Sequence, residues 1–365
     1  MNKNLKVTFC IPSLGSGGAE RVISVLANKF IERGIEVTIL LISNLKCQYD
    51  IDEKIQLQCL HCDEDNNLPF RKRYFLRLKK IKNAIKKIKP DIVISFMSET
   101  NIDVCFALYN INIPIIVSER NDPAIDPSSK IKKILRQIAY FKPKGFVFQT
   151  VDAQNYFSLR VKNKAKIILN PLTSQLPNVR KYENTEKKIV AVGRLNKQKN
   201  FPMLINSFKK FSKIHPEYIL EIYGEGVLKN ELMSLILKYG LEDKIFLKGF
   251  CKNVHEKIST ASMFVMTSNF EGMPNALLEA MAMGLVCIST DCPCGGPRML
   301  IKQKENGILV PIGDEVKLVE AMDFVASNLK EAKKMSNNAL EILNVANVEK
   351  ITDEWIEMIY SCLEE

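Results

Sequence analysis

The chain has 365 residues, of which 46% are hydrophobic and 25% charged; this composition excludes a disordered protein, and the length exceeds one ordinary hydrophobic core. Residues 1–172 hold 28 Lys and Arg against 16 Asp and Glu, whereas the remainder holds 24 against 25. The first half is therefore basic, and we expect its partner to be anionic: nucleic acid, phosphate or an acidic membrane.

The sequence gives no sign of export or of a membrane span. No run of eighteen apolar residues occurs, and MNKNLKVTFCIPSLGSGGAER predicts a first strand and a glycine loop rather than a signal peptide. We therefore expect a cytoplasmic protein whose ten cysteines are reduced. CLHC at 59–62 and CPC at 292–294 have metal-like spacing, but neither has a second ligand pair, so no metal site is predicted.

Short apolar runs alternate with helical patterns along the chain. The runs are apolar throughout, as expected of parallel strands covered on both faces. Strands are predicted at 6–11, 36–42, 92–96, 114–118 and 145–149, and then at 188–193, 218–223, 245–248, 263–267, 285–289 and 307–310. This alternation predicts an α/β protein with two doubly wound, Rossmann-like sheets.

A polar, Pro-containing stretch at 171–187 separates the two sets of strands. We predict an N-terminal domain at 1–172 and a C-terminal domain at 173–347, with ligands bound in a cleft that faces the carboxyl ends of both sets of strands. The last segment, 348–365, is predicted as a helix that carries the only tryptophan, Trp355, and could cap either domain.

The sequence LGSGGAER, at 14–21, follows the first strand and opens a helix. Gly15, Gly17 and Gly18 would let the backbone turn tightly and leave N–H groups free for a phosphate. The alternative is a flexible turn in which Ser16 only caps the helix. The spacing is not GxGxxG, and no acidic residue follows a second strand, so a dinucleotide site is not indicated.

The stretch RKRYFLRLKKIKNAIKKIK, at 71–89, has ten basic residues and no acidic one. Its apolar residues recur every three or four positions, which predicts one face docked on the domain and a Lys/Arg-rich outer face. That outer face could be simply solvated, could bind nucleic acid, or could bind anionic lipid headgroups or a polyprenyl pyrophosphate. Stacking aromatics are not interleaved on it, which disfavours nucleic acid.

Two motifs of the second half point to a ligand. VGRLNKQKN, at 192–200, places Arg194 and Lys199 after a strand, where two cations can clamp a diphosphate; the alternative is solvated loop charge. FEGMPNALLEAMAMG, at 270–284, places Glu271 before a helix and Glu279 within it. Carboxylates accept well from the vicinal hydroxyls of a ribose or hexose, although capping and a lysine pair are the simpler roles.

These motifs together resemble those of retaining glycosyltransferases of family 4. The resemblance rests on the two glutamates, on GRL with a lysine five positions after its arginine, and on the early GSGGAER loop, and it covers nearly the whole chain. It implies the GT-B fold, which has two Rossmann-like domains around a nucleotide-sugar cleft. SERND at 118–122 and TDCPCGGPR at 290–298 resemble the branch that transfers N-acetylgalactosamine or related sugars from UDP onto lipid-linked oligosaccharides.

The resemblance implies roles for the polar side chains of the second half. Arg194 and Lys199 would hold the UDP diphosphate and stabilise its charge as it leaves. Glu279 would accept from the ribose hydroxyls and Glu271 from those of the donor sugar. Other donor contacts are implied at Gly17, Gly18, Gly249, Phe250, Asn253, Gly272, Met273, Pro274 and Asn275. No metal or other cofactor is implied, and the acceptor hydroxyl would attack from the front face without a covalent enzyme intermediate.

The acceptor side is less closely matched. Several relatives have a histidine next to an acidic residue after the fourth strand, where this chain reads Ser118, Glu119, Arg120. We expect Glu119 and Arg120 to contact the acceptor or its phosphate instead. Some relatives use a basic helix for the acceptor pyrophosphate, which suggests the same role for Lys72, Lys79, Lys80, Lys86 and Lys87.

The resulting hypothesis is a glycosyltransferase at the inner face of a membrane that uses a UDP-sugar and a polyprenyl-pyrophosphate-linked or other glycan acceptor, and not nucleic acid. One alternative is a UDP-sugar 2-epimerase, which should show extra acid/base residues in the cleft; His61, His215 and His255 lie in no such motif. The other is a nucleotide-sugar- or nucleic-acid-binding protein without catalysis.

Overall fold

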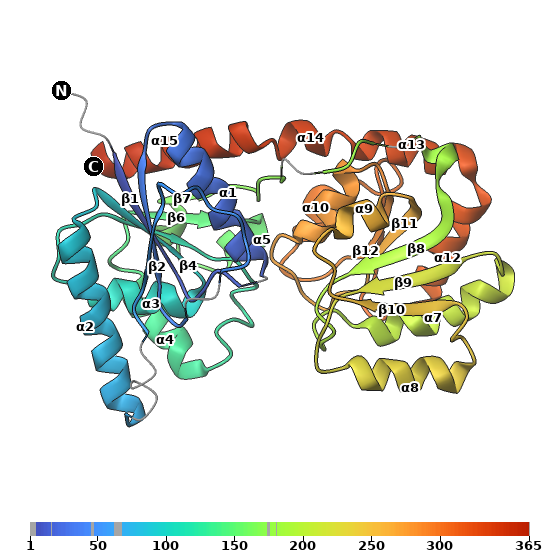
Figure 1. Cartoon of the computed structure of the whole chain (residues 1–365), viewed down its shortest axis with the longest axis horizontal. Coiled ribbons are helices and arrows are strands. Elements are labelled where there is room, and N and C mark those ends of the chain that lie inside the picture. The colour runs from blue at the N-terminus through green and yellow to red at the C-terminus, as the bar shows by residue number, and fades with distance from the viewer. Residues whose placement is uncertain are drawn as a thin grey trace. The chain divides into compact units, whose positions relative to one another are not determined.

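The computed structural model describes residues 5–15, 17–44, 47–61, 68–173, 176–179 and 181–364 (Figure 1). It divides into two compact units, one formed by Met1–Pro171 with Val348–Glu365 and the other by Leu172–Asn347. The first boundary lies one residue before the predicted one. The final helix, for which both domains were open, belongs to the first unit.

The first unit is built on a parallel sheet in the order β3-β2-β1-β4-β5-β6-β7. Its strands are β1 (Lys6–Ile11), β2 (Glu36–Leu41), β3 (Gln56–Cys59), β4 (Ile92–Phe96), β5 (Ile115–Ser118), β6 (Gly145–Phe148) and β7 (Ala165–Ile167). Its helices are α1 (Gly18–Glu32), α2 (Phe70–Ile88), α3 (Ser98–Ala107), α4 (Lys130–Ala139), α5 (Val151–Asn155), α6 (Leu159–Lys162) and α15 (Val348–Glu364). The five predicted strands are confirmed. Strands β3 and β7 were missed because they are short edge strands that lack a buried apolar run.

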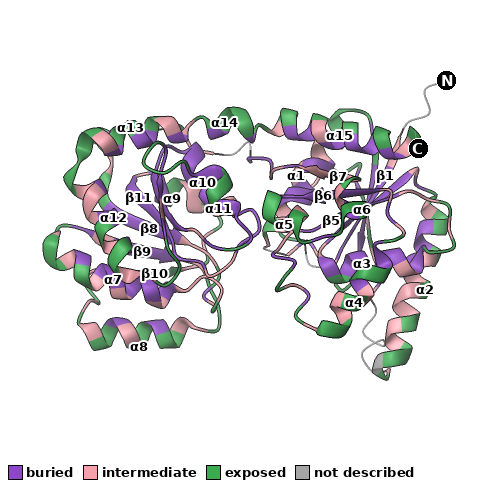
Figure 2. Ribbon diagram, turned by 180° about the vertical axis from the view of Figure 1, so that it is seen from behind, coloured by how far each residue is buried: buried purple, intermediate pink, exposed green. Residues whose placement is uncertain are grey.

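Helices cover both faces of this sheet. Helices α1 and α15 pack together on one face, and α2, α3 and α4 lie side by side on the other (Figures 1 and 2). On α15, Trp355 is fully buried and stacks on Phe96, with ring centroids 5.7 Å apart. Gly145 lies beneath the same helix, where a Cβ would overlap Met358 and Cys362. The last helix is thus part of the first unit's core.

The second unit is a parallel sheet in the order β10-β9-β8-β11-β12-β13. Its strands are β8 (Glu186–Val192), β9 (Ile219–Tyr223), β10 (Ile245–Gly249), β11 (Ala261–Met266), β12 (Val286–Thr290) and β13 (Ile308–Val310). A 3-10 turn, η2 (Tyr182–Asn184), precedes them, and the helices are α7 (Phe201–Ile214), α8 (Lys229–Tyr239), α9 (Val254–Ile258), α10 (Asn275–Ala282), α11 (Gly296–Leu300), α12 (Glu315–Ser327), α13 (Leu329–Ala339) and α14 (Ile342–Val345). All six predicted strands are confirmed.

Both sheets have the doubly wound topology that the sequence predicts, and each has one point where the strand order reverses. This point lies between β1 and β4 in the first unit and between β8 and β11 in the second. In open α/β sheets the loops at the carboxyl ends of these two strands are the usual ligand position. Within the described ranges, no helix is both long enough and apolar enough to cross a bilayer.

Candidate active site

The predicted site residues of the second unit follow the strands at its reversal point. Arg194 and Lys199 lie in the loop between β8 and α7, and Glu271 lies in the loop between β11 and α10. Glu271 is 72 positions from Lys199 along the chain. The loops meet because β8 and β11 are hydrogen-bonded neighbours in the sheet.

The two loops are joined by a set of hydrogen bonds. Gln198 accepts at its carbonyl oxygen from the Asn269 N–H at 2.8 Å, and its side chain donates to the carbonyl oxygen of Phe270 at 3.0 Å. The Thr267 hydroxyl lies 3.0 Å from the carbonyl oxygens of both Lys199 and Asn200. These bonds fix the backbone of the two loops that carry Lys199 and Glu271.

Lys199 and Glu271 form an ion pair. The Lys199 ammonium donates to Oε1 of Glu271, and the Ser268 hydroxyl donates to the same oxygen at 2.6 Å. Both side chains are mostly buried, so water screens their interaction weakly. Arg194 is exposed and stands outside this pair. The structure thus brings together two of the three predicted catalytic residues and shows a partner, Ser268, that the sequence did not indicate.

The backbone after Glu271 is held by the loop that follows β12. The Glu271 N–H donates to the carbonyl oxygen of Pro293 at 2.7 Å, and the Cys294 N–H donates to the carbonyl oxygen of Glu271 at 2.9 Å. Gly296 packs so closely that a Cβ would overlap the carbonyl oxygen of Gly272. This contact explains the second glycine of TDCPCGGPR, Gly296. Without a side chain there, the loop after β12 can lie against the loop that carries the predicted donor amides.

Helix α10 begins after Glu271 and contains Glu279, as predicted. Pro274 precedes its first residue, Asn275, and Gly284 follows it with a φ of 74°, a conformation that glycine adopts without strain. Gly272, Met273 and Pro274 are buried. The N–H groups at this helix start are the predicted donors for a phosphate or sugar oxygen.

Glu279 has a histidine partner. His255 Nε2 lies 2.8 Å from Oε2 of Glu279, which is buried inside α10. His255 lies at the start of α9, just after the predicted donor-binding residues Gly249, Phe250 and Asn253. Phe250 and Asn253 are exposed, and Gly249 has a φ of 72°. The sequence predicted no role for His255 at the donor site. Its position two residues after Asn253 was the available signal.

The glycine loop of the first unit follows β1 and leads into α1, as predicted. Gly17 has an extended backbone with a φ of −94° and precedes α1, which begins at Gly18. Gly17 therefore has a backbone conformation that other residues also adopt. The Glu20 carboxylate lies close to Gly17, so a Cβ there would only make this flexible side chain shift. The Tyr49 hydroxyl also donates to the Gly17 carbonyl oxygen at 2.8 Å, and Ser16 lies outside the described residues.

Glu119 and Arg120 have different surroundings at the end of β5. Glu119 is buried, accepts from the Tyr140 hydroxyl and lies 3.6 Å from Arg136. Glu119 thus has structural partners for one carboxylate oxygen, and its predicted contact with an acceptor stays a prediction. Arg120 stacks on Phe96 at 4.4 Å, and burial lowers its pKa to about 9. Its Nε and Nη2 are buried without a hydrogen-bond partner among the described residues, so Arg120 still has donors for an anion.

Two buried carboxyls should make the stability of the first unit depend on pH. Burial raises the pKa of Glu119 to about 7 against the opposing charge of Arg136, and raises that of Asp103 to about 6 against that of Arg77. Both values exceed those of the unfolded chain, so the native state binds more protons. Its free energy of unfolding should therefore fall as the pH rises from about 4 to about 7, and then level off.

We predict that Glu119→Gln removes most of the decrease in the free energy of unfolding that Glu119 causes between these pH values. That contribution is roughly 3 kcal/mol at most. Urea unfolding at about pH 5 and about pH 8 can be followed by the fluorescence of Trp355, which is buried in the same unit. Glu53→Gln, at an exposed site, is the control and should keep the wild-type dependence. An unchanged pH dependence in Glu119→Gln would contradict the assignment.

Helix α2 has the two faces that the sequence predicts. Ile81 and Ile85 are fully buried, and Arg77 pairs with Asp103 of α3 at 2.9 Å. The predicted acceptor-binding lysines lie on the other face. Lys72, Lys79, Lys86 and Lys87 are exposed, and Lys80 is partly exposed.

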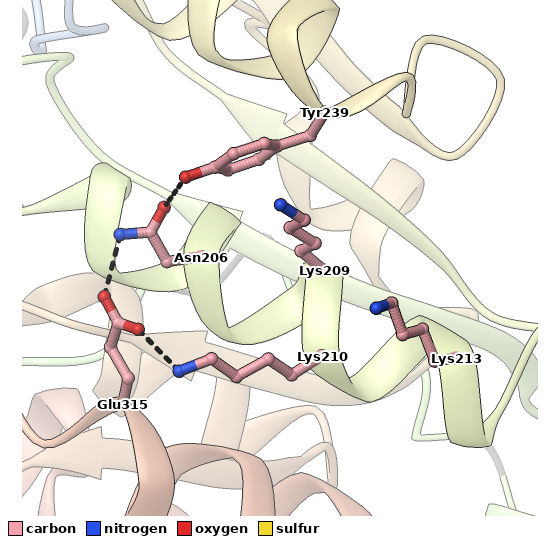
Figure 3. A pocket seen from close by; sticks show the side chains of 6 residues that line it. All are labelled: Asn206, Lys209, Lys210, Lys213, Tyr239 and Glu315. Atoms are coloured by element: carbon pink, nitrogen blue, oxygen red, sulfur yellow. Dashed lines mark hydrogen bonds and ion pairs between the residues drawn. The ribbon is translucent and has the colours of Figure 1, made fainter.

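A pocket of about 330 Å³ lies elsewhere on the second unit, between α7, α8 and α12 (Figure 3). Asn206 links its two sides, accepting from the Tyr239 hydroxyl at 3.0 Å and donating to Glu315 at 2.7 Å. Lys210 pairs with Glu315 at 2.9 Å, and Lys209 lies over the Tyr239 ring. The pocket shares no side chain with the predicted site.

In the part of the chain that the structure describes, His, Cys, Asp and Glu form no group of three that could hold a metal ion.

Two family descriptions match the sequence. "Glycosyl transferases group 1" matches residues 174–342, and "Glycosyltransferase family 28 N-terminal domain" matches residues 10–135. The first match contains all the predicted donor-binding residues of the second unit. The second contains the glycine loop, the basic helix and Arg120.

Two relatives from Campylobacter jejuni match over almost their whole length. The chain is 30% identical to N-acetylgalactosamine-N,N'-diacetylbacillosaminyl-diphospho-undecaprenol 4-alpha-N-acetylgalactosaminyltransferase, over 92% of this chain and 93% of the relative. It is 28% identical to GalNAc-alpha-(1->4)-GalNAc-alpha-(1->3)-diNAcBac-PP-undecaprenol alpha-1,4-N-acetyl-D-galactosaminyltransferase, over 97% of this chain and 98% of the relative.

A solved structure with the same fold is that of Anabaena HepE in complex with UDP-glucose. The TM-score is 0.81 at 15% sequence identity, and the match covers 98% of this chain and 100% of HepE. Similarity at this level of identity establishes a common architecture.

Proposed function

Because the chain belongs to the group 1 glycosyltransferases, with the GT-B fold and of the family 4 type, we propose that it moves a hexose or N-acetylhexosamine from a UDP-sugar to a lipid-linked or surface glycan. N-acetylgalactosamine is the first candidate sugar. The observation that carries the proposal is the Lys199–Glu271 pair at the reversal point of the second sheet. In this proposal the Lys199 ammonium binds the diphosphate, and the neighbouring Glu271 carboxylate accepts from the sugar hydroxyls.

The proposed chemistry uses these two groups in different ways. The Lys199 ammonium can contact the leaving diphosphate while it still touches Glu271, and the exposed Arg194 supplies a second positive charge. Charge on the departing UDP is thereby stabilised by the cations and by the amides at the start of α10. We propose that no metal is needed for this step.

Retention of configuration is proposed for the same site. The acceptor hydroxyl would attack the anomeric carbon from the face that UDP leaves, and a phosphate oxygen of UDP would take the hydroxyl proton. Oε1 of Glu271 is occupied by Lys199 and Ser268, an arrangement that suits a hydroxyl-binding carboxylate better than a nucleophile. Glu279, with His255 beside it, would bind the ribose hydroxyls.

The choice of donor and acceptor rests on the named relatives. Both Campylobacter relatives are named as N-acetylgalactosaminyltransferases that act on undecaprenol-diphosphate glycans, and HepE was solved with UDP-glucose. We propose a UDP-sugar donor and a polyprenyl-pyrophosphate-linked acceptor for this chain. On the first unit, the outer lysines of α2 and the unpaired N–H groups of Arg120 would bind the acceptor's phosphates.

The test of this function is a screen of UDP-sugars for UDP release, with and without a polyprenyl-pyrophosphate-linked sugar. We expect release that depends on both substrates, fastest with UDP-N-acetylgalactosamine. No release with any donor would overturn the proposal. The family matches do not favour the epimerase or the non-catalytic alternative, and the same screen recognises each: an epimerase would convert a UDP-sugar without releasing UDP, and a binding protein would hold it unchanged.

We predict that neutralising α2 impairs lipid-linked acceptors selectively. A variant with Lys79, Lys80, Lys86 and Lys87 changed to glutamine should lose roughly tenfold or more in kcat/KM for a polyprenyl-pyrophosphate acceptor, because each basic residue contributes about 1 kcal/mol near an anionic surface. Slow hydrolysis of the UDP-sugar should persist. The matched control changes four exposed lysines of the second unit, Lys213, Lys238, Lys330 and Lys334. Equal losses in both variants would remove α2 from acceptor binding.

A further inference from the structure

Helix α4 has an unusual outer surface. Ile131, Ile134 and Ile138, with Phe141 just beyond the helix, have between 53% and 70% of their surface exposed. They follow one another at spacings of three, four and three residues, so they form a single row, which we call the α4 stripe. Four large apolar side chains in a row are more than the scattered exposure that soluble surfaces show.

The opposite side of α4 is held firmly. Arg136 is buried and donates to the carbonyl oxygens of Asp126 and Pro123 at 2.7 and 2.8 Å, and Ser129 caps the first turn by accepting from the Lys132 N–H. Lys132 also pairs with Glu99 of α3. The α4 stripe is therefore presented by a fixed helix, and its exposure is not the result of a loosely packed end.

Positive charge surrounds the α4 stripe. Helix α4 has no acidic residue; of its basic residues Lys130 is exposed, and Lys132 and Lys133 are partly exposed. At its end, Arg160 stacks on the Phe141 ring at 4.0 Å and donates to the Phe141 carbonyl oxygen, and the neighbouring Leu159 is 74% exposed. On the same face of the sheet, α2 adds its exposed lysines (Figures 1 and 2).

We propose that the α4 stripe is an interfacial anchor that inserts into an anionic lipid bilayer, with the surrounding cations at the level of the headgroups. A helix with an apolar row and a basic border is the pattern that lies in a membrane surface. A second copy of this chain would meet it with equal positive charge, which disfavours self-association through this face. This inference adds apolar insertion to the electrostatic role of α2, and it rests on the proposed function only in that a lipid-linked acceptor lies in such a membrane.

The direct test is sedimentation of the full chain with vesicles of phosphatidylcholine containing phosphatidylglycerol, without donor or acceptor. The double variant Ile134→Ser, Ile138→Ser should lower the partition coefficient by at least about tenfold, because two isoleucines no longer leave water. The matched control, Val227→Ser with Leu329→Ser, changes two exposed apolar residues of the second unit and should bind as the wild type does. If the α4 double variant binds these vesicles as strongly as the wild type does, the proposal is wrong.

A second measurement reports insertion itself. The only tryptophan, Trp355, is fully buried, so Ile138→Trp places one exposed indole on the α4 stripe. Its emission should shift to the blue on addition of anionic vesicles, and unshifted emission would contradict insertion. If instead analytical ultracentrifugation shows self-association that Ile134→Ser, Ile138→Ser abolishes, a second copy covers the face and the bilayer proposal is wrong.

The activity assay separates this inference from the proposed function. The α4 double variant should keep its UDP release with a water-soluble, short-chain acceptor and lose it with an acceptor embedded in vesicles. If the wild type binds vesicles through the α4 stripe but transfers no sugar to any lipid-linked acceptor, the proposed acceptor is wrong and the anchor stands. If transfer occurs, and the α4 double variant binds vesicles as strongly as the second-unit control variant does, the anchor is wrong and the function stands.

Discussion

Glu271→Gln is expected to lower turnover of the UDP-sugar by about 10²–10³-fold while UDP itself binds nearly as well as before. The change keeps the size of the side chain and a hydrogen-bond acceptor for Ser268, so the second unit should fold. It removes the negative charge of the carboxylate, which makes it a strong acceptor for sugar hydroxyls and orients the Lys199 ammonium. Both effects act on the sugar and its leaving group rather than on uridine.

The measurement is kcat and KM for UDP-N-acetylgalactosamine with a lipid-linked acceptor, together with UDP affinity by calorimetry. Glu242→Gln, at an exposed site of the same unit, is the control and should behave as the wild type does. Retained turnover in Glu271→Gln would reduce Glu271 to a structural partner of Lys199. A parallel loss of UDP binding would mean that the loop, and not the carboxylate, had been damaged.

The location of this site could be predicted because it depends on topology. Apolar runs identify the buried strands, and the doubly wound pattern puts the loops after β8 and β11 at one edge of one sheet. The family resemblance predicts one site for Lys199 and Glu271, which lie 72 residues apart, and the sheet topology explains why their loops meet. Edge strands β3 and β7 escaped prediction because partial exposure leaves them without an apolar run.

The orientation of individual side chains could not be predicted in this way. Glu119 and Arg120 are adjacent in sequence, yet the first points into a network with Tyr140 and Arg136 while the second stacks on Phe96. The contact between His255 and Glu279 joins two helices that share no sequence motif. Such contacts depend on how α-helices pack over a sheet, which is a property of the assembled unit and not of a local pattern.

Lys199→Met is expected to cost both activity and stability. Turnover should fall by about 10³-fold, because the cation that stabilises the leaving diphosphate is lost. The second unit should also lose roughly 2–4 kcal/mol of its free energy of unfolding, since the mostly buried Glu271 carboxylate is left without its ion-pair partner. The double variant Lys199→Met, Glu271→Gln should regain most of that stability and none of the turnover. A double-mutant cycle of urea unfolding and kcat measures both.

Lys197→Met, at an exposed site two residues away, should change neither quantity. Stability that is not regained in the double variant would show that the ion pair does not hold the two loops together, and turnover that is regained would remove Lys199 from the chemistry.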